Sequence, residues 1–249
     1  MEQARSAGRF TSVHDKWWNA AKAARGKAAG TRALIEVLLL ARHMDHEQVV
    51  AGLAAAYRAS AFPREKSLRA FDFEANLNVD PATVNTLATC EWVKKSEPLC
   101  LIGDSGTGKS HLLIVLGTEA ATKGFRVRYV LATKLVNELV EAADEKQLSK
   151  TIARCVRVDL LCIDELGYME LDRRGAELLF QVLTEREEKN SVAIASNESF
   201  SGWTKTFTDP RICAAIVDRL TFNGAIIQTG TESYRLAHTK AQAEQAAAT

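Results

Sequence analysis

The chain has 249 residues and a formal net charge of +1, and 25% of its residues are charged. This length suits one large α/β domain with an appendage, and the five cysteines form no C-x-x-C pair, which argues against a disulfide framework or a zinc site. The longest near-apolar run, residues 33–41, is too short to span a bilayer, so we expect a cytoplasmic protein with no membrane association.

Residues 1–60 form an Ala-rich segment that we expect to be helical. It contains two amphipathic stretches, 30–44 and 45–60, and the second opens with the capping-box spacing of Asp45 and Gln48. Residues 1–32 carry a net charge of +5 from seven basic and two acidic side chains, which fits contact with DNA and equally fits a solvated tail. Residues 61–79 hold a proline and no sustained period, which predicts a linker.

A third segment, residues 80–249, alternates short apolar runs with amphipathic stretches of helical length. Its first helix is expected to begin with Asp80 as N-cap and Pro81 at the first helical position. The apolar runs, expected to be strands, are residues 98–103, 126–132, 158–164, 191–197 and 225–230. The helical stretches between them are residues 109–124, 133–147, 173–190 and 209–220. This alternation predicts a three-layer αβα domain around a five-stranded parallel sheet.

The stretch GDSGTGKS directly follows the first apolar run and fits the phosphate-loop pattern G-x-x-x-x-G-K-[ST]. Its residues are Gly103, Asp104, Ser105, Gly106, Thr107, Gly108, Lys109 and Ser110. Glycines let backbone N–H groups point at phosphate oxygens, and a helix N-terminus adds partial positive charge. We therefore expect Lys109 to contact the β- and γ-phosphates of ATP and Ser110 to ligate Mg²⁺.

An acidic pair ends the third apolar run, VDLLCIDELGY. The strand carries Asp164 to the edge of the sheet that also holds the phosphate loop, where its carboxylate is expected to hold Mg²⁺ through a water. Glu165 follows at once and is placed to orient and deprotonate the attacking water. Adjacent carboxylates at a strand end repel each other unless a cation or an acid–base role compensates, so the pair favours hydrolysis over binding alone.

Three further polar side chains are candidates for the catalytic set. Asn197 ends the fourth run, where its amide could bond the γ-phosphate and the lytic water, although a turn asparagine is the alternative interpretation. Arg219, in IVDRL, and Arg235, in ESYRL, could meet the charge that develops in phosphoryl transfer. Arg211 is an alternative to Arg219, and a surface ion pair is the alternative for any single arginine.

The segments GDSGTGKSHLLIVLGTEA, DLLCIDELGYMELDRRGAELLFQVL and SNESFSGWTKTFTDPRICAAIVDRL resemble the IstB-like helper ATPases of insertion sequences. These are AAA+ ATPases close to the DnaC-type helicase loaders, and the resemblance covers residues 67–237. It implies an ATPase that binds duplex DNA, assembles into homo-oligomers on it and stimulates a cognate transposase. It also implies that Arg219 is an arginine finger for a neighbour's ATP and Arg235 a second sensor. The residues after the last strand are too few for a full helical lid.

Residues 1–60 instead resemble the C-terminal tail of the partner IstA-type transposase, which implies a fusion of that tail to the helper. Two other functions stay open at this point: a DnaC-like replicative helicase loader, and a nucleotide-switched DNA-binding module with incidental hydrolysis. Arg173 and Arg174 are candidate DNA contacts, with a solvated helix start as the alternative interpretation.

Overall fold

The computed structural model divides the chain into two compact units, residues 1–70 and 71–249. It describes residues 71–234 together with Leu236, Ala237 and Thr239, and, before them, only Trp18, Thr31 and Leu68. The helical segment and the transposase-tail resemblance predicted for residues 1–60 therefore lie outside the described residues. No helix in the described part is long and apolar enough to cross a membrane.

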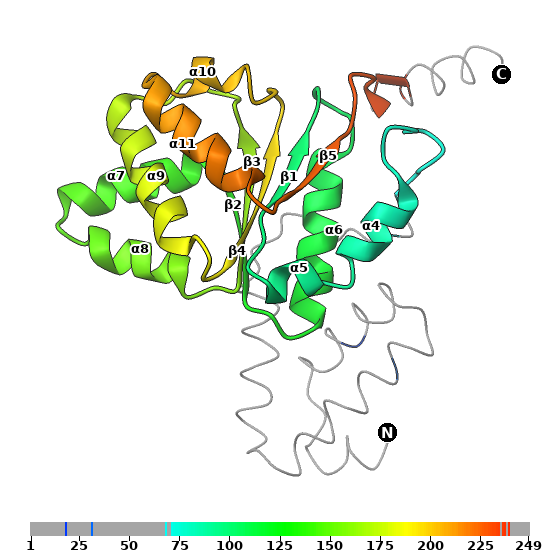
Figure 1. The fold of residues 1–249 in the computed structure, drawn as a ribbon, viewed down its shortest axis with the longest axis horizontal. Coiled ribbons are helices and arrows are strands. Elements are labelled where there is room, and N and C mark those ends of the chain that lie inside the picture. The colour runs from blue at the N-terminus through cyan, green and yellow to red at the C-terminus, as the bar shows by residue number, and fades with distance from the viewer. Residues whose placement is uncertain are drawn as a thin grey trace, which may run out of the picture. The chain divides into compact units, whose positions relative to one another are not determined.

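The second unit is built on a five-stranded parallel sheet with the strand order β2-β3-β4-β1-β5 (Figure 1). The strands are β1 (Leu99–Ile102), β2 (Val127–Leu131), β3 (Leu160–Leu166), β4 (Ser191–Ser196) and β5 (Ala225–Gln228). Each falls on one of the five apolar runs, which confirms the predicted α/β fold with its parallel sheet.

Helices cover both faces of this sheet. The longer ones are α6 (Lys109–Thr122), α7 (Ala132–Asp144), α8 (Leu148–Val156), α9 (Arg173–Arg186) and α11 (Pro210–Thr221), and the shorter ones are α4 (Pro81–Leu87), α5 (Glu91–Lys94) and α10 (Trp203–Thr206). Figure 1 shows α7, α8, α9 and α11 on one side of the sheet and α6 with α4 and α5 on the other. This is the three-layer arrangement that right-handed crossovers between parallel strands produce.

The strands are apolar throughout because both of their faces are buried. Cys100, Leu161 and Ile194 belong to a core cluster that also contains side chains of α7, α9 and α11. Leu101 and Leu160 are equally buried but lie outside that cluster, since alternate residues of a strand point to opposite faces. A strand buried on both faces needs no polar alternation, which explains the continuous runs in the sequence.

One helical detail agrees with the prediction and three differ from it. Asp80 caps α4 by accepting hydrogen bonds from the backbone N–H groups of Ala82 and Thr83, as expected. The helix expected to begin there ends at Leu87, and a separate helix, α5, starts after Cys90, whose φ is 64°. Helices α8 and α10 were not predicted at all, and both are short.

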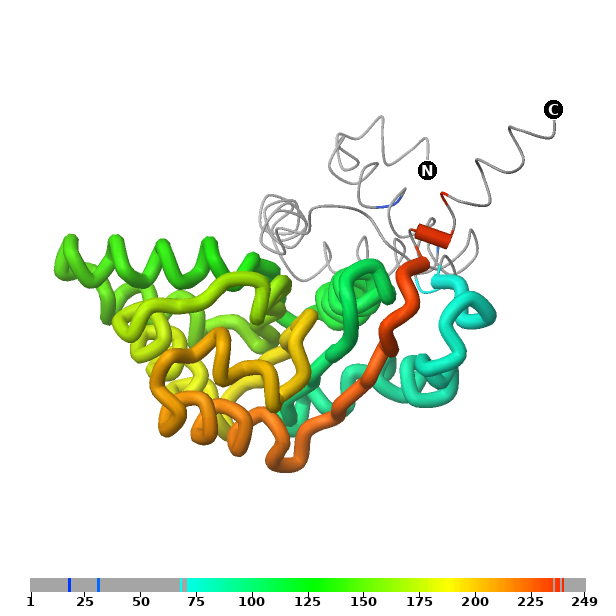
Figure 2. Tube along the Cα trace, turned by 90° about the horizontal axis from the view of Figure 1, so that it is seen from above, coloured from blue at the N-terminus to red at the C-terminus, as the bar shows by residue number. Residues whose placement is uncertain are grey.

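The start of the second unit packs against the end of the sheet. Phe71 and Val79 are buried, and Asn76 donates to the carbonyl oxygen of Thr229 at 2.9 Å. Figure 2 shows this leading segment, in cyan, beside the chain that continues from β5, in red. Residues 71–79 were assigned to a linker by the sequence analysis, and in the structure they belong to the compact unit that begins at Phe71.

Candidate functional site

The predicted phosphate loop connects β1 to the N-terminus of α6. Gly108 is the N-cap of α6 with φ at 98°, and having no side chain it leaves the N–H groups of the first turn uncapped. A Cβ on Gly108 would lie 2.8 Å from the ring of Phe71, so the position requires glycine both for its backbone angle and for space. The loop therefore presents a helix N-terminus where an anion can approach the backbone closely.

Lys109 supplies the positive charge of this loop. Its side chain is buried, with 8% of the residue exposed, and Nζ donates to the carbonyl oxygen of Asp104 at 2.7 Å. The ammonium group thus lies inside the curl of the loop, across from the backbone that follows Gly103. This is the position from which a lysine reaches the phosphates of a bound nucleotide.

Asn76 and Thr229, which the sequence did not single out, hold the phosphate loop through hydrogen bonds from outside the motif. Asn76 donates from one amide nitrogen to the carbonyl oxygens of Thr107 and Thr229, both at 2.9 Å. The hydroxyls of Thr107 and Thr229 are hydrogen-bonded to each other at 2.6 Å, and both residues are buried. These contacts fix the loop to the end of β5 and to the leading segment. The only sequence signal for Asn76 is that it lies within residues 67–237, the range over which the chain resembles the family.

Asp164 and Ser110 meet at the edge of the sheet, as the sequence predicts. Ser110 Oγ donates to Asp164 Oδ1 at 3.0 Å, and Asp164 is only 3% exposed. Two more donors complete its surroundings: the backbone N–H of Glu165 at 2.9 Å from Oδ1, and the hydroxyl of Tyr129 at 2.5 Å from Oδ2. A serine hydroxyl beside a carboxylate is a ligand set that Mg²⁺ accepts in nucleotide sites.

Glu165 is exposed and its backbone adopts φ of 61°. The pairing of β3 with β4 is irregular between Ile163 and Leu166, so the strand is distorted at the acidic pair itself. A left-handed backbone costs a non-glycine residue free energy, and such outliers gather at functional sites. The Glu165 side chain is exposed at this distortion, whereas the neighbouring Asp164 is buried.

Asn197 follows β4 and lies beside the turn after the acidic pair. A Cβ on Gly167 would be 3.2 Å from Asn197 Oδ1, which places the two residues in contact range. Oδ1 is buried and has no hydrogen-bond partner among the described residues. A buried amide oxygen without a partner is uncommon in proteins, and a ligand or water at the site would satisfy it.

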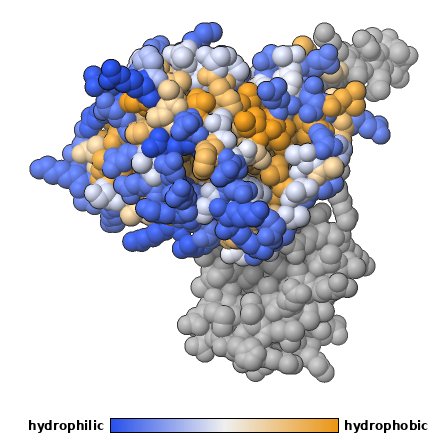
Figure 3. Space-filling model, in the orientation of Figure 1, coloured by the Kyte–Doolittle hydropathy of each residue, from blue (hydrophilic) through white to orange (hydrophobic). Residues whose placement is uncertain are grey.

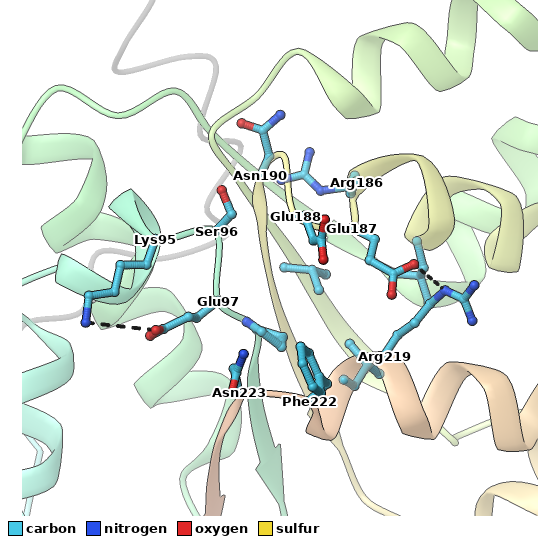
Figure 4. A pocket seen from close by; sticks show the side chains of 14 residues that line it. Lys95, Ser96, Glu97, Arg186, Glu187, Glu188, Asn190, Arg219, Phe222 and Asn223 are labelled. Atoms are coloured by element: carbon cyan, nitrogen blue, oxygen red, sulfur yellow. Dashed lines mark ion pairs between the residues drawn. The ribbon is translucent and has the colours of Figure 1, made fainter.

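Arg219 lies at the opposite edge of the sheet. It is near the end of α11 and lines a cavity of about 170 Å³ together with Lys95 and Pro98, which precede β1 (Figure 4). Its Nε is 2.8 Å from Glu187 Oε2, an ion pair without hydrogen-bond geometry, and its guanidinium stacks 4.8 Å from the centre of the Phe180 ring. Arg219 is therefore not part of the phosphate site of its own chain.

The remaining arginines fall into two groups. Arg235 lies outside the described residues, although the residue before it, Tyr234, donates its backbone N–H to the carbonyl oxygen of Gly106 at 3.2 Å. Arg211, Arg173 and Arg174 are described and exposed. The last two are in surface ion pairs, with Glu177 at 2.9 Å and Asp144 at 2.5 Å.

The residues at the site fit a magnesium nucleotide. The glycine at position 108 leaves the space and the uncapped N–H groups that phosphates need. Ser110 and Asp164 offer oxygen ligands directly beside the loop, and Asn197 Oδ1 is buried without a hydrogen-bond donor among the described residues. Lys109 is the buried cation among them. These features are those that a triphosphate and its metal would need at such a loop.

Solved structures with a similar fold include DnaI and the replication initiator DnaA. The chain superposes on DnaI with a TM-score of 0.56 at 20% identity, covering 66% of this chain and 90% of that one. It superposes on the replication initiator DnaA bound to AMPPCP and single-stranded DNA with a TM-score of 0.52 at 19% identity, covering 70% of this chain and 56% of that one. At these identities the likeness establishes the fold alone.

Sequence relatives come from insertion sequences. The chain is 35% identical over 188 residues to the ATP-binding protein of insertion sequence IS5376 from Geobacillus stearothermophilus, covering 76% of this chain and 75% of that one. It is 34% identical to the ATP-binding protein of insertion sequence IS21 from Pseudomonas aeruginosa, covering 74% and 70%. The profile of the family described as IstB-like ATP binding protein matches residues 8–243. The chain belongs to the IstB-like ATP-binding proteins of insertion sequences.

Proposed function

We propose that this protein is a magnesium-dependent ATPase that assembles on duplex DNA and stimulates transposition of its insertion sequence. The observation that carries the proposal is the contact of Ser110 with the buried Asp164 beside the phosphate loop, with Glu165 exposed next to it. A site that only bound nucleotide would need the loop and the metal ligands, but not a second carboxylate held in a strained backbone at the same edge.

Each residue of the site has a separate role in the proposed reaction. The loop and Lys109 hold the phosphates of ATP, and Ser110 and Asp164 hold Mg²⁺, which neutralises charge on the phosphate oxygens when bound. Glu165 accepts the proton of the attacking water, and Asn197 orients that water against the γ-phosphate. Arg235 is assigned the role of second sensor by the family resemblance alone.

The arginine finger needs a second subunit. Because Arg219 is at the edge of the sheet opposite the phosphate loop, it can meet a γ-phosphate only in a neighbouring protomer. That geometry supports a head-to-tail homo-oligomer, in which each protomer completes the site of the next. Figure 3 shows apolar side chains gathered over β1 and β5 on one face, and Phe222 and Ile226, at the end of α11 and in β5, expose 67% and 43% of their surface. Exposed apolar surface of this kind suits a contact between protomers.

The partners are proposed from the relatives. The relatives are ATP-binding proteins of insertion sequences. With the family resemblance, this supports a cognate transposase as the proposed protein partner and duplex DNA as the proposed assembly template. The DNA-bound DnaA structure shares the fold, which is compatible with DNA binding. With these partners we also propose a cytoplasmic location.

The test is ATP turnover with and without duplex DNA. The proposal expects that DNA raises the rate, and that Glu165→Gln binds ATP with unchanged affinity while turnover falls by about a hundredfold or more, since a general base contributes that much. The matched control is Glu170→Gln, which removes the same charge from an exposed position on the following loop and should keep the rate.

Two other outcomes would change the assignment. A rate that is slow in the wild type and does not respond to DNA would support a nucleotide-switched binding module. Tight binding to a replicative helicase, with no effect of the protein on transposition, would support a helicase loader.

A further inference from the structure

Tyr129 approaches the proposed magnesium site from the neighbouring strand. In the register of β2 with β3, Tyr129 is opposite Cys162 and Leu131 is opposite Asp164. Tyr129 lies two residues from the position opposite Asp164, so the two side chains point to the same face of the sheet and lie diagonally across the strands. The phenol spans that diagonal, and its hydroxyl reaches Asp164 Oδ2 at 2.5 Å. Both residues are buried, with 8% and 3% exposed.

The two carboxylate oxygens of Asp164 accept hydrogen bonds from different donors. Oδ1 accepts from Ser110 Oγ at 3.0 Å and from the backbone N–H of Glu165 at 2.9 Å, and Oδ2 accepts from Tyr129 at 2.5 Å. Burial, and then the hydrogen bond to Asp164, raise the pKa of Tyr129 well above its ordinary value. In this hydrogen bond the Tyr129 hydroxyl is the donor and the Asp164 carboxylate the acceptor.

The Tyr129 contact differs from the Ser110 contact in what happens to it on metal binding. In the proposed function Ser110 Oγ turns its lone pair to Mg²⁺, so it cannot also be relied upon to fix the carboxylate. Tyr129 comes from strand β2 and not from the phosphate loop, so its hydroxyl is not among the groups that the proposed function assigns to the metal. It can hold the plane of the carboxylate in the same orientation before and after the metal arrives.

We propose that Tyr129 is a positioning residue that orients the Asp164 carboxylate for magnesium. The inference rests on the proposed function, since it takes Asp164 as the group that holds the metal. Partners behind a metal-binding carboxylate fix its direction and its basicity, and their loss costs about tenfold or more in metal affinity. Without the hydroxyl, Oδ2 would be a buried carboxylate oxygen without this donor, and the carboxylate would be free to rotate toward another one.

The test is nucleotide binding by calorimetry with the full chain and its Tyr129→Phe variant, each in Mg²⁺ and in EDTA. The probe is ADP, which avoids turnover. We expect Tyr129→Phe to raise the Kd for ADP in Mg²⁺ by about tenfold and to leave the Kd in EDTA unchanged, because the phenyl ring keeps its packing and the loop is intact. An equal change in both conditions would mean a merely structural role, and no change in either would mean that the hydroxyl does not position the carboxylate; both overturn the inference.

A double-mutant cycle and a matched variant sharpen this result. In an Asp164→Asn background, Tyr129→Phe should add no further loss of Mg²⁺-dependent binding, because the carboxylate it acts through is gone. An additive loss there would overturn the inference. Tyr168→Phe removes the same hydroxyl from a residue that is 65% exposed, and it should bind ADP like the wild type in both conditions.

The same experiment separates this inference from the proposed function. If the wild type binds ADP equally in Mg²⁺ and in EDTA, the magnesium site itself is wrong and both proposals fall. If the wild type shows Mg²⁺-dependent binding and Tyr129→Phe matches it, only the role of Tyr129 is refuted. Should Tyr129→Phe not fold, Ser110→Ala in the same titrations gives the size of the metal-dependent binding. The Tyr129 contact is then tested with Tyr129→Met, which also removes the hydroxyl, and a Met variant with unaltered metal dependence would overturn the inference.

Discussion

The position of Arg219 leads to a test in which two inactive variants restore each other. Arg219→Ala should leave ATP binding intact and lower turnover by about a thousandfold, the lower end of what an arginine finger contributes. The Arg219→Ala substitution should lower the free energy of unfolding only slightly. The ion pair with Glu187 is partly exposed, with 43% of the Glu187 side chain accessible. That pair and the stacking on Phe180 together stabilise the fold by about 1 kcal/mol.

The magnitude of the rescue follows from the geometry of a head-to-tail ring. Glu165→Gln keeps Arg219 but cannot hydrolyse its own ATP, whereas Arg219→Ala keeps Glu165 but offers no finger to its neighbour. In a random equimolar mixture, about a quarter of the interfaces join an intact catalytic site to an intact finger. Turnover of the mixture should therefore reach about a quarter of the wild-type rate, when each variant alone is nearly inactive.

The assay is steady-state ATP hydrolysis in the presence of duplex DNA, at a fixed total protein concentration and varied mixing ratio. The rate should peak near equal amounts of the two variants. A mixture no faster than the sum of its components would refute action on a neighbour. Arg211→Ala is the matched control, since Arg211 is the exposed arginine at the other end of the same helix. If Arg211→Ala shows the loss and the rescue, Arg211 is the finger instead.

Two other predictions concern the loop and the core. Gly108→Ala should abolish nucleotide binding in a fluorescence titration, because a Cβ there would lie 2.8 Å from the Phe71 ring. The control is Gly124→Ala, where φ is 93° and a Cβ would have nothing within 4 Å. It should cost only backbone strain of about 1 kcal/mol and bind nucleotide normally. Arg186→Met should lower the free energy of unfolding, measured in urea, by about 3 kcal/mol. The control, Arg173→Met, removes an exposed ion pair and should change it by less than about 1 kcal/mol. Equal effects of the two substitutions would contradict a structural role for the buried arginine.

Arg186 should stabilise the fold because its buried guanidinium contacts several backbone carbonyl oxygens. The residue is 1% exposed and donates to the backbone carbonyl oxygens of Cys155, Val158, Asp159 and Ser191. Burial lowers its pKa to about 10, which still leaves it charged at neutral pH. Methionine fills a similar volume but leaves these buried carbonyls without their donor, and each such group costs about 1 kcal/mol or more.

The sequence predicted the parts of the molecule that depend on local pattern. Strands buried on both faces are apolar without interruption, so β3 and β4 could be located from LLCI and VAIA alone. The phosphate loop could be found because its glycines and Lys109 are fixed by the backbone path of one short turn. Helix α8 was missed because it is only nine residues long and no side chain caps its N-terminus, and the break at Cys90 was missed because its left-handed backbone has no glycine to mark it.

The site residues that were missed act across long separations in sequence. Asn76 is 153 residues from Thr229, and Tyr129 is 35 residues from Asp164. Neither belongs to a spaced motif. The Tyr129 contact depends on the register between β2 and β3, and the Asn76 contacts depend on how the leading segment packs against the loop. An asparagine in an irregular stretch and a tyrosine in an apolar strand have ordinary local explanations, and only the three-dimensional arrangement distinguishes them.

These contacts also bear on where the nucleotide-binding unit physically begins. A phosphate loop must be rigid before the nucleotide arrives, since ordering it on binding would cost conformational entropy for every residue fixed. Here the rigidity comes from both ends of the unit, because Asn76 bonds the loop at Thr107 and Tyr234 bonds it at Gly106. Strand β1 and helix α6 alone would leave those two carbonyls unpaired by protein. The segment from Phe71 is thus as much a part of the loop's structure as the glycines that define the motif.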